Sequence, residues 1–191
     1  MKKIIETNLR EHIDIIQKIL EENCRTIEEI SSVIIGAYRK NKKLLIVGNG
    51  GSSADAQHIA GELVNRFYYD RKPLRAMSLS VDSCAITSWA NDKDYGSIFE
   101  RQVDAHGDLG DILLAISTSG NSLSIINAVN KAKEKSLITV GLLGNYGGKL
   151  KGTCDYELIV PSSNTPRIQE AHEVVYHTIC QLVEEEFAHE K

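Results

Sequence analysis

The stretch that decides the fold is KLLIVGNGGSSADAQHIAGE, residues 43–62. Its apolar run, Lys43–Val47, predicts a strand, the glycines after it predict a tight turn, and Ser53–Arg66 is predicted to be a helix. Backbone N–H groups in such a turn can bind an anion at the helix N-terminus, although a merely tight strand-to-helix turn has the same pattern. Ser53 stands where the dinucleotide fingerprint needs its third glycine, and the P-loop lysine is absent, so neither nucleotide motif is met.

Strands and helices alternate on the C-terminal side of this stretch. Short apolar runs predict four further strands, and periodic apolar residues predict two further helices. The strands are Arg75–Leu79, Ile112–Ile116, Leu137–Leu142 and Glu157–Val160, and the helices are Ser122–Lys133 and about Thr165–Phe187. Strands that are apolar throughout are typical of a parallel sheet covered on both faces. We therefore predict an α/β three-layer sandwich with a five-stranded, mainly parallel sheet.

Residues 1–41 precede this unit and are predicted to form a helical hairpin. Thr26 and Glu29 have the spacing of a capping box, which would start the second helix. The stripe of the first helix consists of apolar residues at three- and four-residue steps: Ile5, Leu9, Ile13, Ile16 and Leu20. This stripe could cover the chain's own sheet or pack against another subunit. We favour the second arrangement, because both helices carry long aliphatic stripes.

Composition and charge exclude several classes of protein. The 191 residues are 42% hydrophobic and 25% charged, as expected for one globular domain rather than a disordered chain. A net charge of −4 leaves no basic surplus for nucleic acid, and no apolar run reaches the roughly 20 residues that cross a bilayer. Acidic residues near the N-terminus argue against a signal peptide, and the four cysteines form no C-x-x-C pair, so we predict a cytoplasmic protein with reduced thiols.

A second candidate ligand loop is STSGNS, residues 117–122, between the strand Ile112–Ile116 and a helix. Its four hydroxyls belong to Ser117, Thr118, Ser119 and Ser122. Hydroxyls and free amides at a helix start can hold a phosphate monoester without a lysine. Simple N-capping would need only one such side chain, so we predict phosphate binding. Both candidate loops follow predicted strands, at the edge where open α/β sheets bind ligands.

Candidate acid–base and metal-ligating residues lie on two predicted helices. His58 and Glu62 are four residues apart and share one helix face. Gln169, Glu173 and His177 step by four along the last helix. These groups can transfer protons or bind a metal, but solvated surface residues would show the same spacing. Gln169 and His177 are about 12 Å apart along the helix axis, so one shared metal site would need a distorted helix start or ligands from two subunits.

Together these segments resemble the phosphoheptose isomerases, a family of the sugar isomerase (SIS) domain superfamily. The resemblance covers nearly the whole chain and is carried by residues 48–58, Glu62, Ala90–Asp92, the STSGNS run, and Gln169 with His177. It implies a single SIS domain of flavodoxin-like topology over residues 1–191. It also implies a cytoplasmic homotetramer with active sites between subunits and one zinc ion per subunit.

The activity implied by the resemblance is aldose–ketose isomerisation. D-sedoheptulose 7-phosphate would become D-glycero-D-manno-heptose 7-phosphate by proton transfer through an enediol, in bacterial heptose biosynthesis. By resemblance, Glu62 and His177 exchange the protons, and His58, Glu62, Gln169 and His177 hold zinc. The implied substrate-binding residues are Asn49, Gly50, Gly51, Ser52, Glu62, Asn91, Asp92, Ser117, Thr118, Ser119, Ser122 and Gln169.

Two alternatives stay open from the sequence. A non-catalytic SIS module, either a regulator or a sugar-phosphate sensor, could keep the phosphate loop, but it would not need His58, Glu62, Gln169 and His177 together. An isomerase of another ketose phosphate is chemically close. Residues 93–96, KDYG, depart from the family pattern after Asp92, so the resemblance gives no expectation for the shape of this loop. Nucleic acid and membranes are not expected as partners.

Overall fold

The structure is a computed structural model that describes residues 1–188, so residues 189–191 of the predicted domain lie outside the described part. One sheet runs in the order β2-β1-β3-β4-β5, and all of its strand pairs are parallel. The strands are β1 (Leu44–Gly48), β2 (Ala76–Ser78), β3 (Ile112–Ser117), β4 (Ile138–Leu143) and β5 (Tyr156–Ile159). This is the flavodoxin-like order, so the predicted fold class is confirmed.

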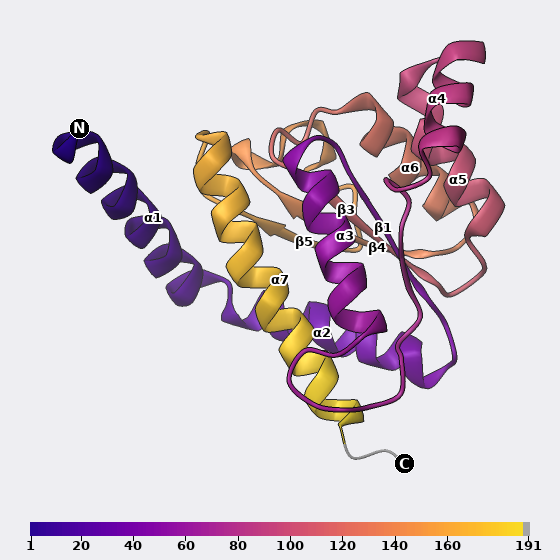
Figure 1. Cartoon of the computed structure of the whole chain (residues 1–191), viewed down its shortest axis with the longest axis horizontal. Coiled ribbons are helices and arrows are strands. Elements are labelled where there is room, and N and C mark those ends of the chain that lie inside the picture. Colours follow the sequence, from indigo (N-terminus) through magenta and orange to yellow (C-terminus); the bar gives the residue numbers. More distant parts are fainter. Residues whose placement is uncertain (189–191) are drawn as a thin grey trace.

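Helices cover both faces of the sheet, and α3 and α7 run side by side across one of them (Figure 1). Side chains alternate between the two faces along each strand, so Ile46 packs with α2, α3 and α7, whereas Val47 packs with α5 and α6. The helices are α1 (Lys2–Glu22), α2 (Cys24–Arg39), α3 (Gly51–Val64), α4 (Ser83–Asp92), α5 (Ile98–His106), α6 (Leu123–Glu134) and α7 (Thr165–Phe187). Two 3-10 turns, η1 (Tyr95–Ser97) and η2 (Asn145–Leu150), complete the set for residues 1–188.

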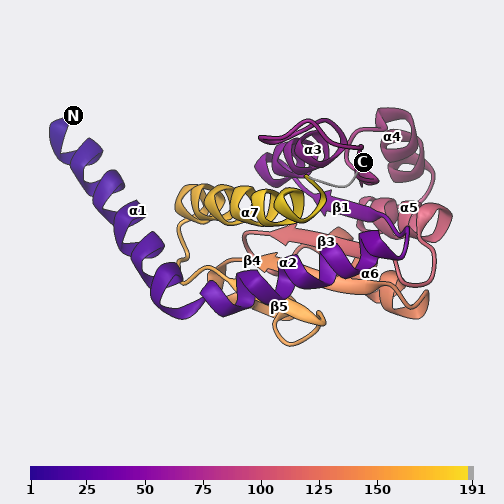
Figure 2. The ribbon, with the colours of Figure 1, turned by 90° about the horizontal axis from the view of Figure 1, so that it is seen from below.

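The N-terminal helices differ from the predicted hairpin. Only Asn23 separates α1 from α2, and its N–H still bonds to Ile19 O at 2.8 Å, so the chain bends there without reversing. A helical hairpin needs a loop of about 2–5 residues. Figures 1 and 2 show α1 pointing away from the sheet instead of lying along α2. The predicted hairpin over residues 1–41 is therefore wrong in shape, although both helices are present.

The predicted capping box is also wrong. The second helix already begins at Cys24, so Thr26 lies inside its first turn, and the N-cap residue Asn23 makes no side-chain capping bond. Glu29 instead accepts a hydrogen bond from Arg25 Nε at 2.9 Å. A capping-box spacing marks a helix start only where the chain is not already helical.

The stripe of α1 is largely uncovered in the single chain. The buried residues of α1 are Ile15 and Ile19, which are not part of the predicted stripe. Within the stripe Ile16 is partly buried, and the other four residues are more than half exposed: Ile5 58%, Leu9 59%, Ile13 62% and Leu20 59%. The chain's own sheet therefore does not cover this stripe.

None of the helices within residues 1–188 is long and apolar enough to cross a membrane.

Candidate active site

The glycine turn after β1 has a shape that side chains would prevent. Gly50 has a φ of +56°, a left-handed conformation that favours glycine. A methyl carbon added at Gly48 would lie 2.2 Å from the Ser52 carbonyl oxygen, and one added at Gly51 would lie 2.1 Å from Gln169 Nε2. The turn therefore lets α3 begin at Gly51 in contact with the carboxamide of Gln169 from α7.

The STSGNS loop lies next to this turn, because β1 and β3 are neighbouring strands. A cavity of about 90 Å³ opens between the two loops. Its lining consists of Asn49, Ser52, Ile116, Ser117, Thr118, Ser119, Ser122 and Ile125. The structure thus brings six predicted substrate-binding residues together around one small polar cavity. No lining residue carries a charge, so only hydroxyls, amides and the α6 N-terminus are available to an anion.

Hydrogen bonds shape the STSGNS loop, and its capping residue bonds to Asn49 of the glycine turn instead of capping the helix. Gly120 N donates to Ser117 Oγ at 3.0 Å, and Asn121 N donates to Ser119 Oγ at 3.1 Å. Ser122 is the N-cap of α6 but makes no side-chain capping bond. Its hydroxyl instead accepts from Asn49 Nδ2 at 2.8 Å. Simple N-capping therefore does not explain this serine.

Tyr95 is a site residue that the sequence analysis missed. Its hydroxyl donates to Asn49 Oδ1 at 2.8 Å, while Asn49 Nδ2 donates to Ser122 and to Ser124, at 2.8 and 2.9 Å. Tyr95 thus joins the divergent 93–96 loop to the cavity. The only sequence signal for it was a tyrosine in that loop, and nothing indicated which way its ring points.

Asn91 and Asp92 are not among the residues that line this cavity. They are exposed at the C-terminal end of α4, where Asn91 Nδ2 donates to Asp92 Oδ1 at 3.0 Å. Helix α4 buries none of its residues. Their predicted substrate contact therefore has no counterpart within the single chain and stays a prediction.

His58, Glu62 and His177 form one group across α3 and α7, which we call the His–Glu–His group. His58 Nε2 lies 3.1 Å from Glu62 Oε1 and 3.5 Å from His177 Nε2. One ligand atom from each residue lies within 4.8 Å of the others. Two imidazole nitrogens and a carboxylate oxygen are ligands that zinc commonly takes in proteins. The donor set therefore fits a zinc ion and comes from a single chain.

Gln169 lies at a different level of α7. Its Nε2 contacts the start of α3 at Gly51, whereas His177 is eight residues further along the helix, about 12 Å along the axis. The structure therefore places Gln169 beside the glycine turn. Its predicted role as a metal ligand stays a prediction.

Two further residues, also missed from the sequence, lie behind the His–Glu–His group. Tyr176, which is 1% exposed, has its hydroxyl 3.1 Å from His58 Nδ1. Asp55 Oδ2 is buried and has no hydrogen-bond partner. Burial raises the pKa of Asp55 to about 6, the charge of Glu173 adds to the rise, and His58 opposes it. Burial, followed by the charges of Asp55 and Glu173, also raises the pKa of Tyr176.

Glu184 of α7 holds the segment that follows α3, residues 67–71, through hydrogen bonds and an ion pair. Glu184 accepts backbone N–H bonds from Phe67 at 2.7 Å, from Tyr68, and from Tyr69 at 3.1 Å. Its Oε1 lies 3.1 Å from Arg71 Nε, and both side chains are fully buried.

Two residues of this segment, Arg71 and Phe67, contact members of the His–Glu–His group. Arg71 donates to Glu62 O at 3.0 Å, and the Phe67 ring lies 5.7 Å from the His177 ring. The chain near two of the three residues of the group is therefore tied to one buried ion pair, between Arg71 and Glu184.

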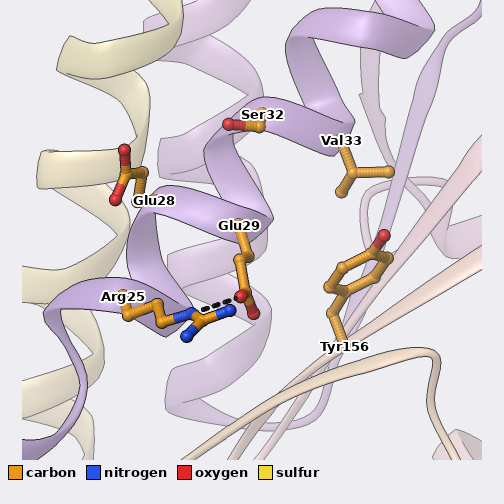
Figure 3. Close-up of a pocket in the computed structure, with 6 residues that line it drawn as sticks. All are labelled: Arg25, Glu28, Glu29, Ser32, Val33 and Tyr156. Atoms are coloured by element: carbon orange, nitrogen blue, oxygen red, sulfur yellow. Dashed lines mark hydrogen bonds and ion pairs between the residues drawn. The ribbon is translucent and has the colours of Figure 1, made fainter.

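A larger hollow, of about 710 Å³, lies on another part of the surface (Figure 3). Its lining comes from α2 and β5 and consists of Arg25, Glu28, Glu29, Ser32, Val33 and Tyr156. None of the predicted site residues lines it, so we do not assign the active site there.

Comparison with known proteins shows the family of the chain. The SIS domain family matches residues 9–144 of the chain. Over 193 residues the chain is 49% identical to the phosphoheptose isomerase of Clostridium acetobutylicum, and the match covers 100% of this chain and 98% of that protein. The chain belongs to the phosphoheptose isomerase family.

Two further phosphoheptose isomerases support this family membership. The enzyme from Aneurinibacillus thermoaerophilus is 48% identical over 187 residues, covering 97% of this chain and 94% of that protein. The structure of the phosphoheptose isomerase from Neisseria gonorrhoeae superposes with a TM-score of 0.91 at 34% identity, covering 96% of this chain and 98% of that one. The family resemblance predicted from the sequence is thus confirmed, and the similarity includes α1 and α2.

Proposed function

We infer that the chain is an aldose–ketose isomerase that converts D-sedoheptulose 7-phosphate to D-glycero-D-manno-heptose 7-phosphate, in heptose biosynthesis. The observation that carries this conclusion is the 49% identity to a phosphoheptose isomerase along the full chain. The His–Glu–His group adds an acid, a base and metal-ligating atoms, which a sugar-phosphate sensor would not need. As in its family, the enzyme works in the cytoplasm.

The phosphate of the substrate binds at the cavity between the glycine turn and the STSGNS loop. Backbone N–H groups at the α6 N-terminus and the hydroxyls of Thr118, Ser119 and Ser122 provide the donors. Asn49 and Ser52 close the cavity from the β1 side, while Gly50 and Gly51 keep the turn open. Gln169 contacts the sugar from the start of α7, and its place at Gly51 supports this role more directly than metal binding.

Proton transfer takes place at the His–Glu–His group. Glu62 removes the proton from the carbon beside the carbonyl, and His177 donates a proton to the carbonyl oxygen, so that an enediol forms. Reprotonation on the neighbouring carbon then completes the isomerisation. The two residues belong to different helices, which lets them reach different sides of a bound sugar. His58, Glu62 and His177 would hold a zinc ion, which would supply a Lewis acid that polarises the carbonyl. Gln169, the predicted fourth ligand, would join them only from another subunit.

The chain assembles as a homotetramer through α1, with one SIS domain per chain over residues 1–191. Support comes from the exposed apolar stripe of α1, including Leu9 and Ile13, on a helix that extends away from the sheet (Figure 2). Helix α4, which has no fully buried residue in the single chain, carries Asn91 and Asp92 and gains contacts in the tetramer, where active sites lie between subunits.

The isomerase assignment is tested by proton NMR with sedoheptulose 7-phosphate in D₂O, and zinc is measured in the same sample. Conversion to an aldoheptose phosphate with solvent exchange is expected, and Glu62→Gln should lose nearly all turnover while staying folded. Tight binding without exchange would instead support a sugar-phosphate sensor. Faster turnover of another ketose phosphate in a substrate panel would reassign the substrate.

Oligomeric state is tested separately, by light scattering. Leu9→Glu, which charges the exposed stripe, should shift the tetramer to smaller species. A control variant, Glu6→Gln, changes an exposed residue of the same helix and should leave the tetramer intact. A tetramer that persists in Leu9→Glu would show that α1 is not the interface.

A further inference from the structure

Three hydroxyl groups surround the carboxamide of Asn49. Its Oδ1 accepts a hydrogen bond from the Tyr95 hydroxyl at 2.8 Å. Its Nδ2 donates to Ser122 Oγ at 2.8 Å and to Ser124 Oγ at 2.9 Å. Each partner is a hydroxyl, which can either donate or accept a hydrogen bond. The carboxamide can therefore face these partners in two orientations, related by exchange of its oxygen and nitrogen.

The two orientations differ in the hydrogen bonds that they allow. In the observed orientation the carboxamide oxygen and both N–H groups are paired. In the reverse orientation the oxygen would accept from both serines, and one N–H would donate to the Tyr95 oxygen, so that the other N–H would have no hydroxyl partner. An unpaired N–H is costly in a half-buried side chain such as Asn49, so the Tyr95 hydroxyl favours the observed orientation.

The orientation of Asn49 decides where the hydroxyl hydrogen of Ser122 points. The Ser124 hydroxyl is buried, accepts from Asn49 and lies 3.3 Å from Ser122 Oγ, so its own hydrogen is available to Ser122. Ser122 Oγ then accepts two hydrogen bonds, and its hydrogen is free for a ligand in the cavity that Ser122 lines. In the reverse orientation the hydrogens of both serines would point to Asn49 Oδ1. A phosphate dianion offers only acceptor oxygens, so it needs the first arrangement.

The loop that carries Tyr95 is fixed to helix α6. Asn127 Nδ2 of α6 donates to Gly96 O at 3.0 Å. A methyl carbon added at Gly96 would lie 2.9 Å from Leu123 Cδ2, so the loop also packs closely on the first residue of α6. Because Ser122 is the N-cap of the same helix, one element positions both Tyr95 and Ser122.

We propose that Tyr95 is a positioning residue for phosphate binding, which fixes the carboxamide of Asn49 so that Ser122 donates its hydrogen to the phosphate of the substrate. Tyr95 acts through Asn49 and Ser122, not by touching the substrate. It should therefore affect binding of the phosphate and not the proton transfers. This inference rests on the proposed phosphate site, but it does not depend on which sugar phosphate is isomerised.

Affinity for methyl phosphate tests the proposal, because this ligand carries a phosphate monoester and no sugar. It is measured on the full-length protein from NMR shifts of the STSGNS amides, at about pH 7.5, where a monoester is mainly dianionic. Tyr95→Phe should weaken binding about three- to tenfold, the net effect of one hydrogen bond. Ser122→Ala removes a hydrogen bond to a charged group and should weaken binding about tenfold or more.

The double variant separates a positioning role from a direct contact. If Tyr95 acts through Ser122, adding Tyr95→Phe to Ser122→Ala should weaken binding by less than about twofold. A full further loss of about three- to tenfold would overturn the proposal, because independent contacts give additive losses. Tyr156→Phe is the control, because it removes a tyrosine hydroxyl on β5 that does not line this cavity, and it should leave the affinity unchanged.

Steady-state kinetics with sedoheptulose 7-phosphate gives a second readout. Tyr95→Phe should raise KM and leave kcat within about twofold of wild type, whereas a general distortion of the site would lower kcat as well and would contradict the positioning role.

The outcomes distinguish this proposal from the proposed function. Unchanged affinity for methyl phosphate in Tyr95→Phe would overturn the proposal and leave the isomerase assignment intact. A wild-type protein that binds methyl phosphate but does not isomerise sedoheptulose 7-phosphate would instead overturn the proposed function and leave the role of Tyr95 standing. A wild-type protein whose STSGNS amides do not shift with methyl phosphate would overturn the phosphate site and the role of Tyr95 together.

Discussion

Replacing Glu184 by glutamine should destabilise the fold by about 3–5 kcal/mol, the usual effect of removing one partner of a buried ion pair. Both carboxylate oxygens of Glu184 accept backbone N–H bonds. Oε1 accepts from Phe67 N and also forms the ion pair with Arg71 Nε, and Oε2 accepts from Tyr68 N and Tyr69 N. A glutamine amide group placed on either side would therefore face at least one N–H donor with its own hydrogens. The Arg71 guanidinium would also remain buried without a counter-charge.

Urea unfolding at equal protein concentration measures this loss. With a slope of about 2 kcal/mol/M, the midpoint should fall by about 2 M. Glu186→Gln is the matched control, because it makes the same change two residues later on α7, where the pair with Arg39 is exposed. That variant should lose less than about 1 kcal/mol. A loss below about 1 kcal/mol in Glu184→Gln, or equal losses in both variants, would refute the reasoning.

The pH dependence of the same pair follows from its charge. Burial alone would raise the pKa of Glu184, but the backbone N–H donors and Arg71 outweigh it and lower the pKa. A lowered carboxyl pKa contributes stability above the unfolded-state pKa, about 4.3, and this contribution is lost as the pH falls through the folded-state pKa. The difference between wild type and Glu184→Gln should therefore be full at pH 7 and shrink below about pH 4. A constant difference across this range would contradict the assignment.

Three further variants test the site. Gly51→Ala places a methyl carbon against Gln169 Nε2, so turnover should fall several-fold. Stability should not fall, because alanine favours a helix more than glycine does. Unchanged kinetics would contradict the placement of Gln169. Tyr95→Phe removes one hydrogen bond to Asn49 and should raise KM about three- to tenfold with little change in kcat, which steady-state kinetics measures. Gly120→Ala puts a side chain at a φ of +62° and against the η2 backbone. Calorimetry should therefore show a Tm at least several degrees lower. An unchanged Tm would contradict this close packing of the loop against η2.

Periodicity and turn chemistry were sufficient to predict the elements that position the site. The last helix was predicted at Thr165–Phe187 and lies there, and the glycine turn and the STSGNS loop do lie at neighbouring strand ends. The helices between β2 and β3 were not predicted from the sequence, although Ile98, Phe99 and Val103 of α5 have helical spacing and are buried.

Contacts between side chains on different elements could not be predicted from the sequence. The bond from Tyr95 to Asn49, and that from Tyr176 to His58, each depend on the orientation of one rotamer across two segments far apart in the chain. The position of Gln169 at Gly51 depends on how α7 is placed against α3, which no spacing within α7 determines. The bend at Asn23 likewise depends on the absence of a loop, which the apolar stripes do not reveal.

The neutral lining of the phosphate cavity affects how the substrate arrives. A helix N-terminus attracts an anion only within about its first turn. Because the cavity lining carries no charged side chain, its electrostatic attraction for a distant phosphate is weak. The chain carries a net charge of −4, and a sugar phosphate is also negative, so at long range the two repel each other. Dissolved salt screens this repulsion over about 10 Å at 0.1 M. Moderate ionic strength should therefore speed up capture of the substrate, the opposite of the behaviour of anion sites that are built from lysine and arginine.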